Sequence, residues 1–382
     1  MTSNSNIQYS DKFQIHLRFQ LVKVAKNEFR FVTISESIKI KIDNDSFPLE
    51  KVLMQLQKGI SLKSLLSSVP KLNQSETIDV VESLFKRRLI EKINQNPTLS
   101  KNELSLYDEQ IRFFSNFYAS IQTDTSVQTE SGAYAIQKKI KHSKVCIIGL
   151  GKIGSKVAQG LSSIGVQKII GSDFSKVTKS DTLHGVYHTS YIGKQKESVL
   201  KNILMQVNKN TKYSPLKKQI QNASDIPKGI DLLVLCEDTF DPQQFDLINQ
   251  ICLETNTTWV SYRNLGLKFE IGPTIYPFET ACFKCYSLRK SGAMSSYDNY
   301  IASQQNIVDN DIKIGSMNQS FGSDLLIMDI IKTLTNFSRS STYNNIFSFN
   351  LISFESENHP ILRIPRCPQC GASNKKPLDI WQ

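Results

Sequence analysis

The stretch VCIIGLGKIGS, residues 145–155, places a short apolar strand directly before three glycines, Gly149, Gly151 and Gly154. Their spacing is G-x-G-x-x-G, and the residues that follow have the apolar spacing of a helix. In this order, backbone amides and a helix N-terminus can face a phosphate group. Asp173 ends the next predicted strand and is placed to accept hydrogen bonds from a ribose. The stretch therefore predicts a Rossmann-like nucleotide-binding unit.

The sequence around this turn continues the same pattern over residues 144–270. The apolar runs KVCIIG, KIIGSD, DLLVLC and TWVSYR alternate with segments of helical spacing. Such alternation is typical of an α/β fold, in which helices wrap a parallel sheet.

The composition is that of a globular protein, with 382 residues, seven cysteines and a formal net charge of +11. No apolar run approaches the roughly 20 residues that cross a bilayer, and the first ten residues lack the regions of a signal peptide. We therefore expect a cytoplasmic protein that does not associate with membranes. Lysines spread along the whole chain carry the positive charge, which favours an acidic partner or simply a soluble surface.

Residues 12–95 have a self-contained pattern of their own. Three strand-like runs, FQLVKV, FRFVTI and SIKIKID, precede three segments of helical spacing. This order predicts a small winged helix-turn-helix domain. The polar residues 96–104 are predicted to be a linker, and residues 105–382 to form the second domain.

Four of the cysteines fall into two C-x-x-C pairs, Cys282 with Cys285 and Cys367 with Cys370. In a reducing compartment this pattern indicates a metal site sooner than disulfides. Four thiolates complete a tetrahedral zinc site without an open position, which is the geometry of a structural metal. We expect this zinc to staple the C-terminal segment onto the second domain. A redox dithiol or plain core cysteines are the alternatives.

Several motifs together resemble a known family. LYDEQIRFF, the glycine stretch, DLLVLCEDT, IGPTIYPFETACFKC and CPQCG have the order and spacing of the ThiF-like, or ubiquitin-activating-enzyme-like, adenylation fold over residues 105–375. Within it, the chain is similar to the leader-peptide-binding partner proteins of thiazole/oxazole-modified peptide (TOMM) biosynthesis, including thiopeptide and bacteriocin pathways. Their N-terminal PqqD-like domain is a recognition element for ribosomally synthesised and post-translationally modified peptides (RiPPs).

This resemblance implies a mode of leader binding. An extended leader peptide would add a strand beside the third predicted strand and pack against the third predicted helix. Lys39, Lys41 and Arg88 would favour an acidic leader. The implied strand edge is Ser37, Ile38, Lys39, Ile40, Lys41 and Ile42, and the implied helix face is Val80, Val81, Leu84, Phe85 and Arg88.

The resemblance also implies that the nucleotide site has lost its catalytic groups. Adenylation needs cations near the phosphates. Active family members have an Arg where this chain has Glu109 and a second Arg where it has His184, while Asp238 matches the metal-binding acid and Lys194 or Lys196 a phosphate-contacting lysine. We expect no catalytic residue and no bound ATP or magnesium. The implied vestigial nucleotide site is Gly149, Gly151, Gly154, Asp173 and Asp238.

The function that the resemblance implies is a non-catalytic scaffold. It would bind the leader of a ribosomally made precursor and present the core to a separate YcaO-type ATP-dependent cyclodehydratase, which forms azolines from Cys, Ser or Thr. A flavin-dependent azoline dehydrogenase is a further expected partner, and the chain is expected to form a homodimer. One alternative is an active ATP-dependent adenylating enzyme that acts on a peptide carboxylate.

A DNA-binding regulator is another alternative, which the winged helix and the basic charge suggest. The third predicted helix argues against it, because acidic residues occupy its middle and its basic residues are confined to the last turns. We therefore expect no nucleic-acid partner.

Overall fold

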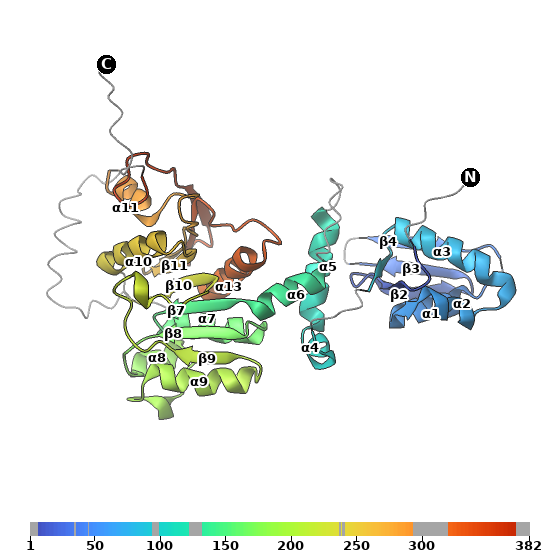
Figure 1. The fold of residues 1–382 in the computed structure, drawn as a ribbon, viewed down its shortest axis with the longest axis horizontal. Coiled ribbons are helices and arrows are strands. Elements are labelled where there is room, and N and C mark those ends of the chain that lie inside the picture. The colour runs from blue at the N-terminus through green and yellow to red at the C-terminus, as the bar shows by residue number, and fades with distance from the viewer. Residues whose placement is uncertain are drawn as a thin grey trace, which may run out of the picture. The chain divides into compact units, whose positions relative to one another are not determined.

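The structure is a computed structural model that describes residues 7–33, 36–44, 46–93, 99–121, 132–236, 238, 241–292 and 320–371 (Figure 1). The chain divides into two compact units, Met1–Lys138 and Lys139–Gln382. None of the described helices is both long and apolar enough to cross a membrane.

The N-terminal unit contains two small antiparallel sheets. One has the strand order β2-β3-β4, so that β4 lies at its edge, and the other has the order β5-β1-β6. The second sheet was not predicted, because its strands have only two to four residues and show no clear alternation. The strands are β1 (Lys12–Ile15), β2 (Gln20–Ala25), β3 (Glu28–Val32), β4 (Ser37–Lys41), β5 (Ile60–Ser61) and β6 (Ile90–Lys92).

Three helices and a short 3-10 turn complete the core of this unit. Apolar residues at helical spacing, such as Val52, Leu53 and Leu56, pack against Phe13 and Phe31 from the two sheets. The elements are α1 (Leu49–Lys58), α2 (Leu62–Ser68), η1 (Lys71–Asn73) and α3 (Gln74–Lys86).

The predicted linker over 96–104 differs from the structure at its C-terminal end. Residues 94–98 lie outside the described residues, and Ser100 begins α4 with a capping box in which Glu103 is its partner. The N-terminal unit extends through this region because Arg112 donates to the Leu17 carbonyl oxygen at 3.1 Å. The helices here are α4 (Lys101–Leu106), α5 (Asp108–Ile121) and α6 (Ala133–His142), which runs across the boundary of the two units.

The second unit is built on an eight-stranded sheet, which confirms the predicted α/β class with a Rossmann-like half. The strand order is β14-β13-β12-β11-β10-β7-β8-β9, parallel from β9 to β11 and antiparallel from β11 to β14. The strands are β7 (Lys144–Ile148), β8 (Lys168–Ser172), β9 (Lys212–Pro215), β10 (Leu232–Cys236), β11 (Trp259–Asn264), β12 (Lys268–Ile271), β13 (Asn345–Asn350) and β14 (Ser356–Pro360).

Helices cover both faces of this sheet. One set, α7, α9 and α13, packs together, and α10 packs against α11. Leu233, Trp259, Phe245 and Phe283 form a core between the sheet and the second set. The elements are α7 (Lys152–Ser163), α8 (Lys179–His184), η2 (Thr189–Tyr191), α9 (Lys196–Val207), η3 (Ala223–Asp225), α10 (Pro242–Glu254), α11 (Phe283–Gly292) and α13 (Ser320–Thr335).

The register fixes which segments lie at the two ends of the sheet. The glycine turn follows the last residue of β7, at the carboxyl end of the parallel strands. Trp259, at the start of β11, forms a bridge with Ile275, and Thr274 forms one with Tyr343. The segments around residues 274 and 343 therefore lie at the amino end of the parallel strands, opposite the glycine turn.

Candidate functional site

Each glycine of the turn meets a different steric demand. Gly149 has a left-handed backbone with φ of 79°, and its amide donates to the Ser172 carbonyl oxygen at 2.9 Å. A methyl group at Gly154 would collide with the Gly149 carbonyl oxygen, and one at Gly151 would collide with the Asp238 carboxylate. The predicted strand, turn and helix thus form the compact loop that the motif requires.

The Asp238 carboxylate lies at the N-terminus of α7. Its two oxygens accept the Lys152 amide at 3.1 and 3.2 Å. A helix N-terminus favours negative charge, and here a side chain of the chain itself supplies that charge. Burial raises the pKa of this carboxyl above its usual value. A phosphate that approached this amide would meet an anion already in place.

The Asp173 carboxylate is also occupied by internal donors. One oxygen accepts the Leu150 amide at 2.9 Å, and the other accepts the Ser175 amide at 2.9 Å and its hydroxyl at 2.6 Å. Lys196 Nζ lies 3.5 Å from the first oxygen. A ribose would therefore have to compete with these donors for the carboxylate that the sequence assigned to it.

Lys196 joins the acids of this loop into one network. Its buried ammonium group also lies 3.4 Å from the Asp181 carboxylate. Asp181 and the N-cap residue Thr178 form the capping box at the start of α8. Glu197 accepts the Asp173 amide at 3.1 Å, and burial raises the pKa of Glu197. The carboxylates of Asp173, Asp181, Asp238 and Glu197 thus lie around the buried ammonium group of Lys196.

Three other residues were singled out around the nucleotide site. His184 is the last residue of α8, and Lys194 Nζ lies 5.2 Å from the centre of the Tyr191 ring. Glu109 lies in the first turn of α5, in the N-terminal unit. Sequence reasoning missed Tyr187, a buried residue whose hydroxyl donates to the Leu150 carbonyl oxygen at 2.7 Å and so anchors the loop. No motif in the sequence signals that contact.

The edge strand β4 is the second candidate site, and its hydrogen-bonding direction follows from the ladder. The amide of Ile42 donates to Asn27 and that of Thr33 to Glu36, which are opposed pairs of β3 and β4 at either end. Hydrogen-bonded pairs alternate along an antiparallel ladder. Ile38 and Ile40 therefore direct their main chain toward β3. The residues whose N–H and C=O groups point away from the sheet are Ser37, Lys39 and Lys41.

The side chains around this edge divide into exposed cations and half-buried apolar groups. Lys39 lies 2.7 Å from Glu28, and Lys41 lies 2.8 Å from Asp43. The apolar side chains of Ile38, Ile40 and Ile42 are partly buried against the core. The strand thus presents lysines on one face and isoleucines on the other.

On α3, only some of the residues that the resemblance implies as peptide contacts are exposed. Val81 is 0% and Leu84 is 2% exposed, and both belong to the core of the unit, so neither side chain can contact a peptide on the surface. Val80 and Phe85 are partly exposed, and Arg88 is exposed just beyond the end of the helix. The difference arises because the core occupies more of this helix face than its spacing alone indicated.

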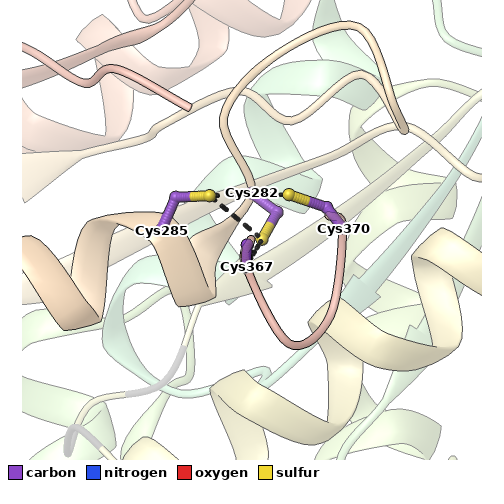
Figure 2. A group of neighbouring side chains, drawn as sticks. All are labelled: Cys282, Cys285, Cys367 and Cys370. Carbon is purple, nitrogen blue, oxygen red and sulfur yellow. Dashed lines mark hydrogen bonds between the residues drawn. The ribbon is translucent and has the colours of Figure 1, made fainter. Parts of the chain in front are cut away.

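The four cysteines of the two C-x-x-C pairs come together, as the sequence predicted (Figure 2). All four are buried, and their Sγ atoms lie within 4.8 Å of one another. The sulfur separations are 3.9 Å between Cys282 and Cys285, 3.7 Å between Cys282 and Cys367, and 3.5 Å between Cys285 and Cys370. A zinc–sulfur bond of about 2.3 Å gives tetrahedron edges of roughly 3.8 Å. The cluster therefore fits a zinc ion.

The surroundings of the cluster also suit thiolates. The Ile364 amide donates to Cys285 Sγ at 3.4 Å, and Arg363 donates to the Cys370 carbonyl oxygen at 2.6 Å. Hydrogen bonds shared among the sulfurs raise the pKa of the Cys282 thiol well above its usual value. A bound zinc would drive these thiols to thiolates. Since two sulfurs belong to α11 and its start and two to the C-terminal loop, the metal would join those segments.

Comparisons with known proteins place these features in a family. The model of the ThiF family matches residues 120–372. The sulfur carrier protein ThiS adenylyltransferase of Escherichia coli is 23% identical over 254 residues, which are 63% of this chain and 91% of that protein. Ubiquitin-like modifier-activating enzyme 5 of Dictyostelium discoideum is 27% identical over 166 residues, 39% of this chain. The chain spans only 42%, 38% and 37% of that enzyme and its two Caenorhabditis counterparts.

Among solved structures, the likeness extends over both units. The structure of E. coli MccB with AMPCPP and MccA has a TM-score of 0.64 at 17% identity, and it covers 94% of this chain and 99% of that one. The microcin C7 biosynthetic enzyme MccB in complex with N-formylated MccA has a TM-score of 0.63 at 18% identity, with 94% and 100% covered. Because the family model begins at residue 120, coverage of this extent includes the N-terminal fold.

Proposed function

Since the chain belongs to the ThiF family, we propose that it binds the leader segment of a ribosomally made precursor peptide. It presents the rest of that peptide to a separate YcaO-type enzyme, which uses ATP to cyclise Cys, Ser or Thr side chains to azolines. This chain acts as a scaffold and contributes no catalytic group. The observation that carries the proposal is the open edge of β4 beside partly exposed apolar residues.

The edge of β4 offers a main-chain template. Ser37 and Lys39 direct two N–H donors and two carbonyl acceptors away from β3, toward the side where a strand could be added. Each such hydrogen bond contributes about 0.5–1.5 kcal/mol net. Strand addition therefore supplies affinity that does not depend on the sequence of the leader.

Side chains then select the leader and its register. Ile38, Ile40 and Ile42, with Val80 and Phe85 of α3, expose apolar surface that is continuous with the core cluster. Lys39 and Lys41 are exposed cations whose present partners are the acids Glu28 and Asp43. Acidic residues of a leader would replace Glu28 and Asp43 as the partners of these lysines. Because one ion pair replaces another, this preference contributes only modestly to the affinity for the leader.

The likeness to MccB supports the same reading of the N-terminal fold. MccB has been solved with MccA, and the match covers the part of this chain that carries β4. The closed network around Asp173, Asp238 and Lys196 supports the assignment of chemistry to another protein.

The experiment is a binding titration with a matched pair of variants. The labelled leader of a candidate precursor peptide is titrated with the purified protein, and fluorescence anisotropy is measured. Lys39→Pro removes one outward N–H and the side chain, whereas Lys39→Ala removes the side chain alone. We expect the proline variant to weaken binding at least tenfold and the alanine variant less than threefold. Equal losses in the two variants would exclude strand addition at β4.

An adenylating enzyme is the second candidate, and two observations favour it. The glycine loop, Asp173 and Asp238 lie together, and the sequence is related to an adenylyltransferase over most of that relative's length. Calorimetric titration with ATP and magnesium tests it directly. Micromolar affinity followed by peptide-dependent pyrophosphate exchange would establish the enzyme, whereas no binding would support the scaffold.

A further inference from the structure

A cavity lies at the end of the large sheet opposite the glycine turn. It has a volume of about 520 Å³ and is bounded by the loop before α11, the loop between α13 and β13, and the segment after β14. The bridge between Thr274 and Tyr343 places two of these segments at the amino end of the parallel strands. The cavity therefore lies away from the glycine turn, and it shares Arg363 with the surroundings of the cysteine cluster. Small-molecule sites usually have volumes of about 300–1,000 Å³.

The cavity is lined mainly by polar side chains. Besides two arginines and one glutamate, hydroxyl and amide groups line it, together with the apolar residues Ala281, Pro360, Ile361 and Leu362. Such a lining favours a hydrogen-bonding ligand over an apolar one. The polar residues that matter most are Glu279, Arg339, Ser341, Tyr343, Asn344 and Arg363.

The two guanidinium groups lack acidic partners. Arg339 stacks 4.1 Å from the centre of the Tyr343 ring, and Arg363 donates to the carbonyl oxygens of Phe278 and Cys370, each at 2.6 Å. Over the described part of the chain, no carboxylate forms an ion pair with either arginine. Arg339 also shares a side-chain hydrogen bond with Tyr343, but a guanidinium has five N–H donors, so others remain for a planar anion.

The single acid of the cavity wall is held by a neighbour. Glu279 accepts the Tyr343 hydroxyl at 2.8 Å. With two arginines and one glutamate, the lining has an excess of one positive charge. That excess matches the single charge of a carboxylate, and the negative charge of Glu279 opposes a ligand of higher negative charge.

The frame behind the cavity is rigid. Asp329 is buried and accepts the Ser340 hydroxyl at 2.8 Å and the Ser341 amide at 2.6 Å, which fixes the loop that carries Arg339. On the other side, Arg363 holds Phe278 in a left-handed conformation with φ of 62°, which bulky residues rarely adopt. Preorganised donors of this kind bind ligands without the cost of ordering a loop.

We propose that this cavity is a binding site for a carboxylate-bearing ligand, with the guanidinium of Arg339 as the main contact and Arg363, Ser341 and Asn344 as supporting donors. The carboxylate belongs either to a small organic acid or to the C-terminus of a peptide. Both sources present the same planar anion to the arginine, so the chemistry recognised is the same.

The test uses the full-length, zinc-loaded protein and calorimetric titration with defined probes. Succinamate has one carboxylate, succinamide is its neutral counterpart, and inorganic phosphate is the competing anion. N-acetyl-triglycine and its C-terminal amide represent the peptide source. We expect succinamate or N-acetyl-triglycine to bind with one-to-one stoichiometry, and the neutral probes at least tenfold more weakly. The stronger of the two carboxylates identifies the source.

Variants locate the binding. Arg339→Gln should weaken carboxylate binding at least tenfold, and Arg339→Lys should retain part of it, since it keeps the charge and loses the planar fork. Lys209→Gln removes one positive charge from an exposed turn of the same unit and should have no effect. The proposal is overturned by equal binding of acid and amide, by tighter binding of phosphate, by equal losses in Arg339→Gln and Lys209→Gln, or by no binding at 10 mM probe, a concentration above the ~1 mM scale of weak ligands.

Discussion

The edge of β4 and the glycine loop differ in how far their polar groups are already satisfied. At β4, an edge strand, the N–H and C=O groups of Ser37 and Lys39 point away from the sheet. At the glycine loop, the carboxylates of Asp173 and Asp238 accept amides of the loop itself, and Lys196 bridges two acids. The difference teaches that the acids of a glycine turn can be engaged by the turn itself, whereas an edge strand keeps main-chain groups directed outward, where we propose that the leader binds.

Loss of zinc should produce the largest difference between the two regions, because it should affect the unit that contains the glycine loop and leave β4 unaffected. Cys367→Ser removes one of four ligands, and structural zinc contributes roughly 10–16 kcal/mol in small zinc domains. We expect mass spectrometry to show that the variant has lost its zinc, and we expect the second unit of the variant to be less stable than that of the wild type. Leader binding should change by less than about twofold, because β4 belongs to the other unit. A variant that lacks metal but is fully stable would contradict the prediction that zinc holds the C-terminal segment to the second unit.

Lowering the pH should change the stability of the two units in opposite directions. Burial lowers the pKa of His16 to about 4, so the unfolded chain binds this proton near pH 6.5 and the N-terminal unit loses stability as the pH falls from 7 toward 4. The full effect is about 3 kcal/mol. Glu91, 3.8 Å from His16, offsets part of it, since burial raises the pKa of Glu91.

The acids of the glycine loop behave differently. Burial raises the pKa values of Asp238 and Glu197. As the pH falls through these folded-state values, protonation of the two groups therefore increases the free energy of unfolding of the second unit. Hydrogen exchange measured from pH 7 to 5 should therefore show the N-terminal unit opening first. His16→Gln should flatten this pH dependence, and an unchanged profile would contradict the assignment.

Charge reversal at β4 sharpens the comparison at the level of side chains. Lys39→Glu with Lys41→Glu should weaken binding of an acidic leader by about 1–2 kcal/mol, because two weak surface attractions become repulsions. The loss should shrink at high salt. Lys23→Glu on β2, the other edge of the same sheet, is the matched control. Unchanged affinity in the double variant would show that these lysines do not face the leader.

The smallest expected effect tests whether the glycine loop is closed by its own acid. Asp238→Asn removes the anion at the N-terminus of α7, which is worth about 0.3–1 kcal/mol. We therefore expect affinity for ATP without magnesium to rise slightly, by less than about tenfold. In an active enzyme, the same change would instead abolish binding of magnesium-ATP. Isothermal titration distinguishes the two directions.

Some of these features were predictable because they depend on local spacing. The glycine turn needs only a strand, a helix and three positions without side chains, and the two C-x-x-C pairs define four ligands at once. The fold class and the gathering of the cysteines were confirmed for that reason.

Other features depend on partners far apart in the chain. Strand β14, SENHP, is polar throughout and contains a proline, so only its pairing with β13 makes it a strand. The contact of Asp238 with the Lys152 amide joins residues 86 apart. The leader partner, the cyclodehydratase and the homodimer stay predictions, because they concern other molecules.

The position of the second cysteine pair has a consequence for biosynthesis. Cys367 follows Cys282 by 85 residues, and β13 and β14 lie between them. A nascent chain therefore exposes Cys282 and Cys285 long before their partner sulfurs leave the ribosome. Only a chain synthesised through Cys370 can close the four-sulfur site, so a chain truncated before that residue should not bind zinc there.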